Sequence, residues 1–533
     1  MKRRLVSLLL GLTLCISVVA CSNGGKVTNS DQVQEQSVEE SQEKLEIEGA
    51  SYIELADNLI TVDGDAATTD ANAAVYVAND IVYYEEGKDF TYGEGTKEDE
   101  HSKEEAEAHT VVHITKPGTY VLSGKLSAGQ IAVDLGEEAE DDPEAVVTLV
   151  LNNVDITCSV APGVIFYNVY ECSSSDEEEA TKDVDTSAAG ANVLLPDGTN
   201  NTVNGSYVAR IYKSVELNEE GTEVVDSKKL HKYDGAFYSK MSMNVNGGEE
   251  NTGTLNIYAE NEGLDTELHL TLNGGTVNIV SGNDGINTNE DNVSVTTVNG
   301  GFLNIRVDGQ TGEGDGIDSN GWLVINGGVV HAAACSTSMD AGIDSDKGIH
   351  INGGTVVATG NMLDHISESE QNYVVFSFQN IVEAGEEITL KKGEEEIFFS
   401  LANDYTNLVI SYANLTEGTY TLWKGEEQLR VVENNGGGMM MPGGFGGGQM
   451  PEGFGPGQIP EGFDRGQMPE GFEPGQIPEG FDRGQMPEGF EPGQMPGGGR
   501  GGFGDSKTNT ENAVAEFEIK AGGNMFMVVS TKL

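Results

Sequence analysis

Basic residues and cysteines are scarce in this sequence of 533 residues. It carries 29 Lys and Arg against 88 Asp and Glu, a formal net charge of −59. A nucleic-acid binder that contacts phosphates needs clustered Lys and Arg, so this function class is excluded. Five cysteines are too few for a disulfide scaffold. Glycine, with 71 residues, and acid are abundant instead, which favours a turn-rich β structure that can hold cations.

Long apolar runs are also missing. The longest, Leu5–Val19, follows a basic start and is too short to span a bilayer stably. It ends in Val-Val-Ala-Cys-Ser, which resembles the lipobox of bacterial lipoproteins, so we expect a signal peptide over residues 1–20 and acylation of Cys21. The alternative is an ordinary signal peptide with an incidental cysteine. The lipobox reading predicts a protein on the extracellular face of the bacterial cell membrane, attached by its lipid alone.

Two segments have the composition of unfolded chain. Residues 21–51 are polar, acidic and poor in aromatic side chains, and we interpret them as a tether. Residues 436–504 hold ten of the 14 prolines and repeat a nonapeptide typified by Gln-Met-Pro-Glu-Gly-Phe-Glu-Pro-Gly. Proline and glycine at this density preclude a packed core, so a disordered Gly/Pro/Met-rich segment is predicted. It is interpreted as a spacer, with its recurring Phe residues as an alternative contact for a partner.

An internal repeat dominates the middle of the chain. Asn-Gly-Gly begins at five positions spaced 27, 26, 27 and 26 residues apart, and a short β-type run follows four of them. The triplets begin at Asn246, Asn273, Asn299, Asn326 and Asn352. Short strands, Gly and Asn turns and the absence of helical periodicity predict an all-β fold, a right-handed parallel β-helix over residues 52–365. The asparagines are expected to turn the chain and to stack as an amide ladder.

After this region the period stops. Strand-like runs with new spacing predict a small antiparallel β module over residues 370–433, which would cap the exposed end of the solenoid. Strand patterning resumes in residues 505–533.

A second recurring motif carries acidic residues. In Gly-Ile-Asp-Ser-Asn and its relatives the apolar residue should point inward, so the polar residues on either side of Ser share an outer face. Successive strands lie about 4.8 Å apart, where stacked carboxylates repel, and no Lys or Arg occupies these columns in the sequence. Ca²⁺ would relieve this repulsion with oxygen ligands. The candidate ligands are Asp265, Glu267, Asp284, Asn287, Asn289, Asp315, Asp318, Asn320, Asp344 and Asp346. The alternative is a solvated acidic face with Asx-type turns.

Signals for catalysis are weak. The G-x-S-x-G, H-E-x-x-H and P-loop motifs are absent. Acidic pairs are so numerous that none points to a glycosidase centre. Trp322 lies in a repeat and is a candidate for stacking on a sugar ring, with packing as the alternative.

Several of these motifs resemble a bacterial cell-surface family of carbohydrate-binding domain-containing proteins. They are Asp234–Lys240, the repeated Gly-Gly-Thr-Val-Asn-Ile, the Asp-Gly-Ile-Asp-Ser turns and Val147–Thr157. The characterised type is a clostridial protein that binds cellulose and acid sugars. Over residues 52–430, the resemblance implies a right-handed parallel β-helix like that of polysaccharide lyases. It also implies bound Ca²⁺ and binding of plant cell-wall polysaccharide without demonstrated cleavage.

These observations together predict a lipid-anchored, calcium-dependent and non-catalytic polysaccharide-binding protein. Two alternatives remain open: a calcium-dependent polysaccharide lyase, which needs a basic residue near the ion, and a surface adhesin or structural protein.

Overall fold

A computed structural model describes residues 45–367, 369–434 and 512–529. The predicted signal peptide, most of the tether and the 436–504 segment lie outside these residues. The described residues of Ile47–Leu533 form one compact unit. Among the described residues no helix has the length and apolarity needed to cross a membrane. The α-helix α1 (Lys103–Glu107) and the 3-10 helix η1 (Glu137–Asp141) have five residues each.

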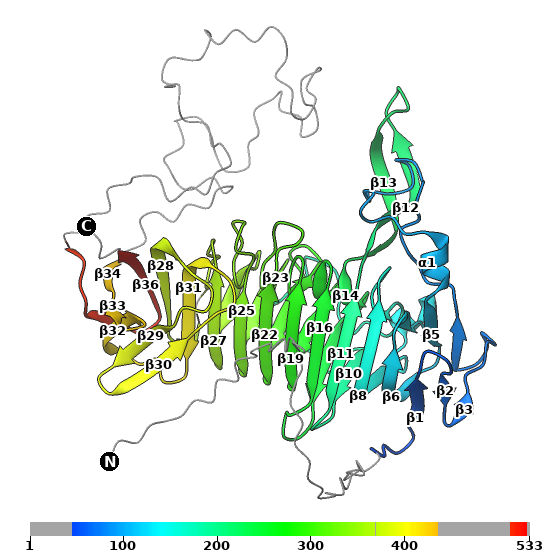
Figure 1. Cartoon of the computed structure of the whole chain (residues 1–533), viewed down its shortest axis with the longest axis horizontal. Helices are drawn as coiled ribbons and strands as arrows, with labels where there is room; N and C mark the ends of the chain where they lie inside the picture. The colour runs from blue at the N-terminus through cyan, green and yellow to red at the C-terminus, as the bar shows by residue number, and fades with distance from the viewer. Residues whose placement is uncertain (1–44, 368, 435–511, 530–533) are drawn as a thin grey trace, which may run out of the picture. The chain divides into compact units, whose positions relative to one another are not determined.

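The repeats are built from three series of parallel strands (Figure 1), and each repeat up to β25 (Val329–Ala333) adds one strand to each series, whereas the last repeat adds β26 (Gly348–Ile351) and β27 (Thr355–Gly360) alone. In all three, a strand pairs in parallel with its counterpart in the next repeat. Series 1 consists of β8 (Val147–Cys158), β10 (Ala191–Leu195), β15 (Met243–Gly247), β18 (Leu270–Leu272), β21 (Val295–Val298), β24 (Trp322–Ile325) and β26 (Gly348–Ile351). Series 2 continues from the second half of β8 through β11 (Asn200–Gly205), β16 (Thr254–Ala259), β19 (Thr276–Ser281), β22 (Phe302–Val307), β25 (Val329–Ala333) and β27 (Thr355–Gly360).

Series 3 forms a separate sheet of eight strands. Its first strand pairs antiparallel and the others are parallel. The strands are β4 (Val75–Ala78), β5 (Thr110–Ile114), β7 (Gly129–Val133), β9 (Val164–Phe166), β14 (Gly235–Ser239), β17 (Glu262–Thr266), β20 (Ile286–Thr288) and β23 (Ile317–Ser319). This series carries the acidic motif.

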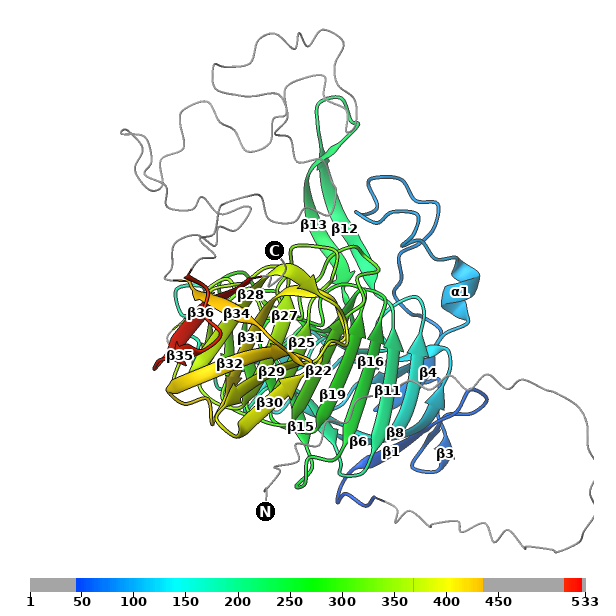
Figure 2. The same cartoon turned by 60° about the vertical axis from the view of Figure 1, so that its left-hand side comes forward.

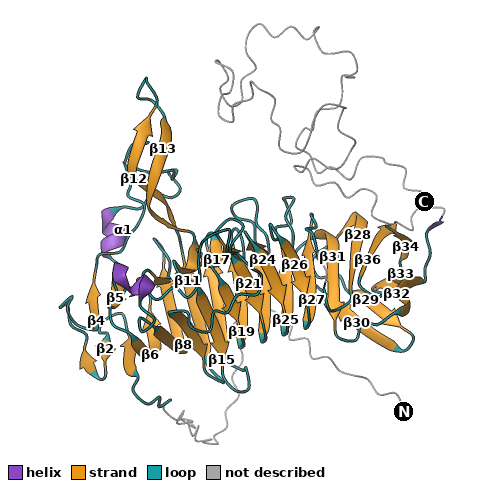
Figure 3. Ribbon diagram, turned by 180° about the vertical axis from the view of Figure 1, so that it is seen from behind, coloured by secondary structure: helices purple, strands orange, loops and turns teal. Residues whose placement is uncertain are grey.

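Further strands flank the three series (Figures 2 and 3). At the N-terminal side are β1 (Ser51–Leu55), β2 (Thr61–Val62), β3 (Asp65–Ala66) and β6 (Gly118–Leu126). A separate antiparallel hairpin joins β12 (Val208–Leu217) and β13 (Val224–Tyr233). After residue 372 come β28 (Tyr373–Val382), β29 (Ile388–Lys392), β30 (Glu395–Phe399), β31 (Tyr405–Tyr412), β32 (Gly418–Lys424), β33 (Glu427–Gln428), β34 (Arg430–Glu433), β35 (Phe517–Ile519) and β36 (Gly523–Val529).

The prediction of an all-β chain with parallel strands is confirmed, but the sheets are mixed. In the last module β31 pairs antiparallel with β27, and β36 adds to β28 in parallel. The strand β36 therefore joins residues after 512 to a module that begins at residue 373.

The core follows from the alternation of side chains along the strands. The Thr-Val-Asn-Ile pattern of series 2 buries its second and fourth residues, and these pack with the inward residues of the other two series. In β19, for example, Val277 and Ile279 are 2% and 1% exposed. A second cluster lies under the module after residue 372, and it includes Phe376, Tyr420 and Phe526.

The Asn-Gly-Gly triplets turn the chain as expected. The asparagines form a ladder in which each amide nitrogen donates to the side-chain oxygen of the preceding asparagine, at 2.9–3.0 Å. The last glycine of four triplets has a φ of +75° to +80°. At Gly301, a Cβ atom would lie 2.3 Å from the carbonyl oxygen of Gly275 in the repeat before. Only glycine fits here, both for its conformation and for the close approach of the two repeats.

We predict that Gly301→Ala destabilises the protein by roughly 3 kcal/mol, from a left-handed conformation that costs about 1–2 kcal/mol and a backbone clash. Gly312→Ala is the matched control, because Gly312 has a φ of +97° and open space around its Cβ position. It should cost only about 1–2 kcal/mol. Urea unfolding midpoints measure both, and equal losses would contradict the close packing of the repeats.

Candidate metal centre

The acidic motif lies on the side of series 3 that faces away from the core. The apolar residue of each motif is fully buried in the core, and its neighbour points to the other side of the sheet. The register pairs Asp265 with Asn287, and Asn287 with Asp318. The row continues in the next repeat, where the amide of Asp344 donates to the carbonyl oxygen of Ile317 at 2.7 Å. These four polar residues form the strand row.

Two more rows flank the strand row. The far row, two residues further along each strand, consists of Glu267, Asn289, Asn320 and Asp346. The turn row, at the position before the glycine of each motif, consists of Glu262, Asp284 and Asp315. Backbone hydrogen bonds hold both rows in register: the amide of Asn289 donates to the carbonyl oxygen of Thr266, and the amide of Gly263 donates to that of Asp284. The structure therefore brings all ten predicted ligand residues onto neighbouring repeats.

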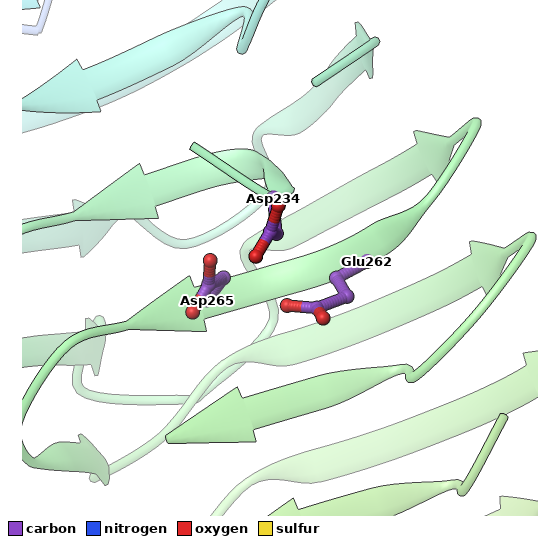
Figure 4. Close-up of side chains that lie close together, drawn as sticks. All are labelled: Asp234, Glu262 and Asp265. Carbon is purple, nitrogen blue, oxygen red and sulfur yellow. The ribbon is translucent and has the colours of Figure 1, made fainter. Parts of the chain in front are cut away.

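Three carboxylates converge at the first end of these rows (Figure 4). One oxygen from each of Asp234, Glu262 and Asp265 lies within 4.8 Å of the others. Their exposed fractions are 8%, 5% and 0%. The Oε2 atom of Glu262 and the Oδ2 atom of Asp265 are buried without a hydrogen-bond partner. Burying such oxygens costs free energy, unless a group that is absent from the protein chain contacts them.

Neighbouring amides orient this cluster. Asn287 donates from Nδ2 to Glu262 Oε1 at 3.1 Å, and Asn289 donates from Nδ2 to Asp265 Oδ1 at 2.5 Å. The Oδ1 atom of Asn287 is buried and, like the two carboxylate oxygens, has no partner. Three unsatisfied oxygens, from two carboxylates and an amide, thus belong to groups that contact one another. These are the ligand types that Ca²⁺ prefers.

No Lys or Arg occupies the acidic columns themselves, but basic residues reach them from another part of the fold. The β12–β13 hairpin supplies two lysines. Lys232 Nζ lies 2.5 Å from Asp234 Oδ2, and Lys229 Nζ lies 2.9 Å from Glu267 Oε1. The hydroxyl of Tyr238 also donates to Glu267 at 2.6 Å. These contacts leave Glu262 and Asp265 without a lysine partner among the ion pairs of the described residues.

Burial and mutual repulsion raise the pKa values across the site. For Glu262 and Asp265, burial first and nearby carboxylates second hold the pKa well above the ordinary range. The same causes raise the pKa of Asp318 and of Asp344 to about 7. The pKa of Asp315 rises to about 10, because the carboxyl is buried beside Asp284. Without a counter-charge, these groups cannot all be ionised at neutral pH.

The second half of the rows is held by backbone amides. Asp284 accepts from the amide of Asp315 at 2.6 Å, and Asp315 accepts from the amide of Ala341 at 2.5 Å. The Oδ1 atom of Asp344 is buried without a partner. Asp364, which was not predicted, accepts from the amide of Ser345 at 3.0 Å and raises the pKa of Asp344. This end therefore also offers an unsatisfied carboxylate oxygen close to other acids.

Sequence reasoning missed Asp234 and Glu262 as site residues. Each precedes a glycine, as Asp284 and Asp315 do, so an acid-Gly pattern was available to find them. The two lysines had no such signal, because only the fold brings their hairpin to the rows.

Trp322 lies apart from the rows, at the start of β24 in series 1. Its ring is half-buried, and Lys347 Nζ lies 5.0 Å from the ring centroid. The lysine thus covers part of one face of the ring. The role of Trp322 in sugar binding stays a prediction.

We predict that the metal-free protein loses stability as the pH rises from about 4 to about 7. The folded state keeps protons on Asp318 and Asp344 up to about pH 7, whereas the unfolded chain releases them near pH ~4. Urea midpoints at pH 5 and pH 7 in metal-free buffer, compared with those of the Asp318→Asn/Asp344→Asn variant, isolate this contribution. The wild type should lose more than the variant between the two pH values. An equal or smaller loss would mean that these carboxyls titrate normally.

Among three comparisons with known proteins, the match to a protein family is the informative one. A search of curated proteins finds no match. One solved structure, of a polysaccharide lyase-like protein from C. thermocellum in a gadolinium derivative, matches with 17% identity and a TM-score of 0.29. The match covers 60% of this chain and 92% of that one. Residues 108–427, more than half of the sequence, match a family of carbohydrate-binding domain-containing proteins. The chain therefore belongs to the carbohydrate-binding domain-containing protein family.

Proposed function

We propose that this protein is an extracellular, lipid-anchored and non-catalytic protein that binds polysaccharide in a calcium-dependent manner. The observation that carries the proposal is the set of buried oxygens without partners on Glu262, Asp265, Asn287 and Asp344, within rows of acids kept in register. Membership of a carbohydrate-binding family supplies the ligand class. Plant cell-wall glycans, such as cellulose or pectin and other acid sugars, are the proposed partners. The lipid at Cys21 would hold the protein at the outer face of the membrane.

We further propose that the repeats wind as a right-handed parallel β-helix. Three series of strands, in which a strand pairs in parallel with its counterpart in the next repeat, support this interpretation. A solenoid of this kind offers a long, regular surface that suits an extended polymer.

Calcium gives an acidic protein a way to bind an anionic sugar. The rows would supply carboxylate and amide oxygens to the ion, and a uronate carboxylate could complete the coordination. Asp346 is exposed and Asp318 is partly exposed, so this part of the rows is accessible to a ligand. In this proposal the ion both stabilises the fold and bridges to the glycan.

The proposal that the protein is not catalytic rests on the ion pairs that the basic residues near the rows form. A lyase needs a basic residue that can accept a proton close to the metal ion. Arg306 and Lys347 are the basic residues that the sequence offered for this role. Arg306 lies on β22 in another sheet, and Lys347, which follows Asp346, is ion-paired with Glu177.

The hairpin lysines Lys232 and Lys229 are each ion-paired with a carboxylate as well. Burial of Lys232 lowers the pKa of its ammonium, but the neighbouring Asp234 outweighs this and raises the pKa above its ordinary value, which makes Lys232 a poor base.

Removing two acids from the strand row should weaken the response to calcium. Ca²⁺ that binds only the folded state adds about 2.7 kcal/mol at ~100 times its Kd. The Asp318→Asn/Asp344→Asn variant should lose most of this shift and melt below the wild type at millimolar Ca²⁺. Without metal it should melt at or above the wild type, because repulsion is relieved.

The matched control is Asp65→Asn/Asp141→Asn, which removes two exposed acids outside the rows. It should keep the full calcium shift in thermal melts. If the row variant melts at or above the wild type at millimolar Ca²⁺, these two residues do not bind the ion.

Glycan binding tests the proposed function directly. The full chain should bind polygalacturonate in Ca²⁺ and lose this binding in a chelator, because the ion forms the bridge between two anions. Isothermal titration with and without chelator measures the effect, and absorbance at 235 nm reports any unsaturated product. Calcium-independent binding of polygalacturonate would contradict the bridge, and release of unsaturated uronides would establish a lyase.

A further inference from the structure

The strands β11, β16, β19 and β22 of series 2 lie side by side (Figure 1). Their outward side chains differ in chemistry from the acidic rows of series 3. Parallel pairing keeps the outward residues of these four strands in three rows. The outward residues are Asn200, Thr202, Asn204, Thr254, Asn256, Tyr258, Thr276, Asn278, Val280, Phe302, Asn304 and Arg306. We call this surface the amide face.

The amide face carries no carboxylate, although the whole chain has 88 acidic residues. Its twelve outward residues are amides, threonines, two aromatics, a valine and one cation, Arg306. The acids of the recurring motif lie on series 3 instead, and Asp155 on β8 borders the amide face beside Thr202. Because the acidic motif and these uncharged side chains lie on different sheets, the two surfaces suit different ligands. The acidic rows suit cations, and anions bridged by them, whereas this face suits uncharged groups.

Two aromatic side chains stand exposed on this face. Tyr258 is 44% exposed and Phe302 is 51% exposed. They lie on β16 and β22 with β19 between them, at opposite ends of the strands. Strand spacing and rise place them about 16 Å apart. This is too far for the two rings to cover each other, so each offers a separate apolar platform to a ligand.

The amides between the two rings are held in a fixed arrangement. Asn256 donates to Asn200 Oδ1, Asn278 donates to Asn256 Oδ1, and Asn304 donates to Asn278 Oδ1, each at 2.9 Å. This ladder uses one N–H of Asn278 and one of Asn304, and an amide group has two. The remaining donors and acceptors are therefore already oriented, which reduces the entropy that a ligand must lose to bind them.

We propose that the amide face binds an extended, uncharged polysaccharide whose sugar rings stack on Tyr258 and Phe302 while its hydroxyls bond to the amides between them. This proposal rests on the proposed polysaccharide binding and assigns it a second surface, separate from the metal centre. A polyanion fits this face poorly, because Arg306 is the only charge on it and the protein as a whole carries −59. A protein partner fits poorly as well, because the two rings are isolated by polar groups rather than joined in one apolar patch.

The test compares the wild type with Tyr258→Ala/Phe302→Ala in sedimentation with microcrystalline cellulose, a neutral insoluble glucan. Both proteins are the full chain in Ca²⁺, and polygalacturonate binding is measured in parallel. Phe90→Ala is the control, because Phe90 is equally exposed, at 48%, on a different segment. Thermal melts establish that all variants are folded.

The double variant should bind cellulose about tenfold or more weakly, as expected for the loss of two contact residues at the centre of a binding surface. Its polygalacturonate binding should be unchanged, and Tyr258→Phe/Phe302→Tyr should restore cellulose binding. Equal cellulose binding by the double variant would overturn the amide face. So would a wild type that binds polygalacturonate but not cellulose, although the proposed function would then stand. A wild type that binds neither glycan would overturn both proposals.

Discussion

The parallel hydrogen-bonded register between successive repeats is the constraint on which the rest of this structure depends. Because each strand pairs with its counterpart one repeat later, any side chain that recurs in the sequence is placed next to its own kind. Valine and isoleucine then form continuous apolar columns, and asparagine forms ladders of amide hydrogen bonds. The same register stacks aspartate on aspartate about 4.8 Å apart, where repetition produces repulsion rather than cohesion.

The protein relieves this repulsion differently along the rows. Asn287 and Asn289 replace acids in one repeat and donate to the carboxylates of the repeat before. The hairpin lysines neutralise Asp234 and Glu267. Backbone amides stabilise Asp284 and Asp315. Despite these contacts, one carboxylate oxygen each of Glu262, Asp265 and Asp344 stays buried without a hydrogen-bond partner. Those atoms are where the proposed cation would contribute most to folding, because nothing else in the described chain satisfies them.

The sequence predicts the contacts between equivalent positions of neighbouring repeats, but not the contacts with segments outside the repeat pattern. Asp318 and Asn287 could be placed side by side because they occupy the same position of a recurring motif, although the spacing between successive motifs varies. Lys229 and Lys232 could not, since they lie in a hairpin with most of its residues exposed. Such a hairpin lacks the apolar alternation that marks a strand, and its sequence resembles a loop. Asn256, Asn278 and Asn304 recur at the same position of the strand motif, so their stacking could be predicted. Their exposure to solvent could not, because it depends on where the rest of the chain packs.

The distribution of charge among the series separates two kinds of surface along the same repeats. The acids of the recurring motif lie on series 3, and the ladder of the amide face lies on series 2, where it ends at Asn304 because His331 and Val357 occupy its row in the next two repeats. The two surfaces lie on different sheets, so a substitution such as Asn287 for an acid alters the acidic rows without changing this ladder. Conversely, Phe302 can stand exposed in a protein of strongly negative charge because that charge keeps copies of the molecule apart. The high net charge thus permits an exposed aromatic surface that would promote association in a neutral protein.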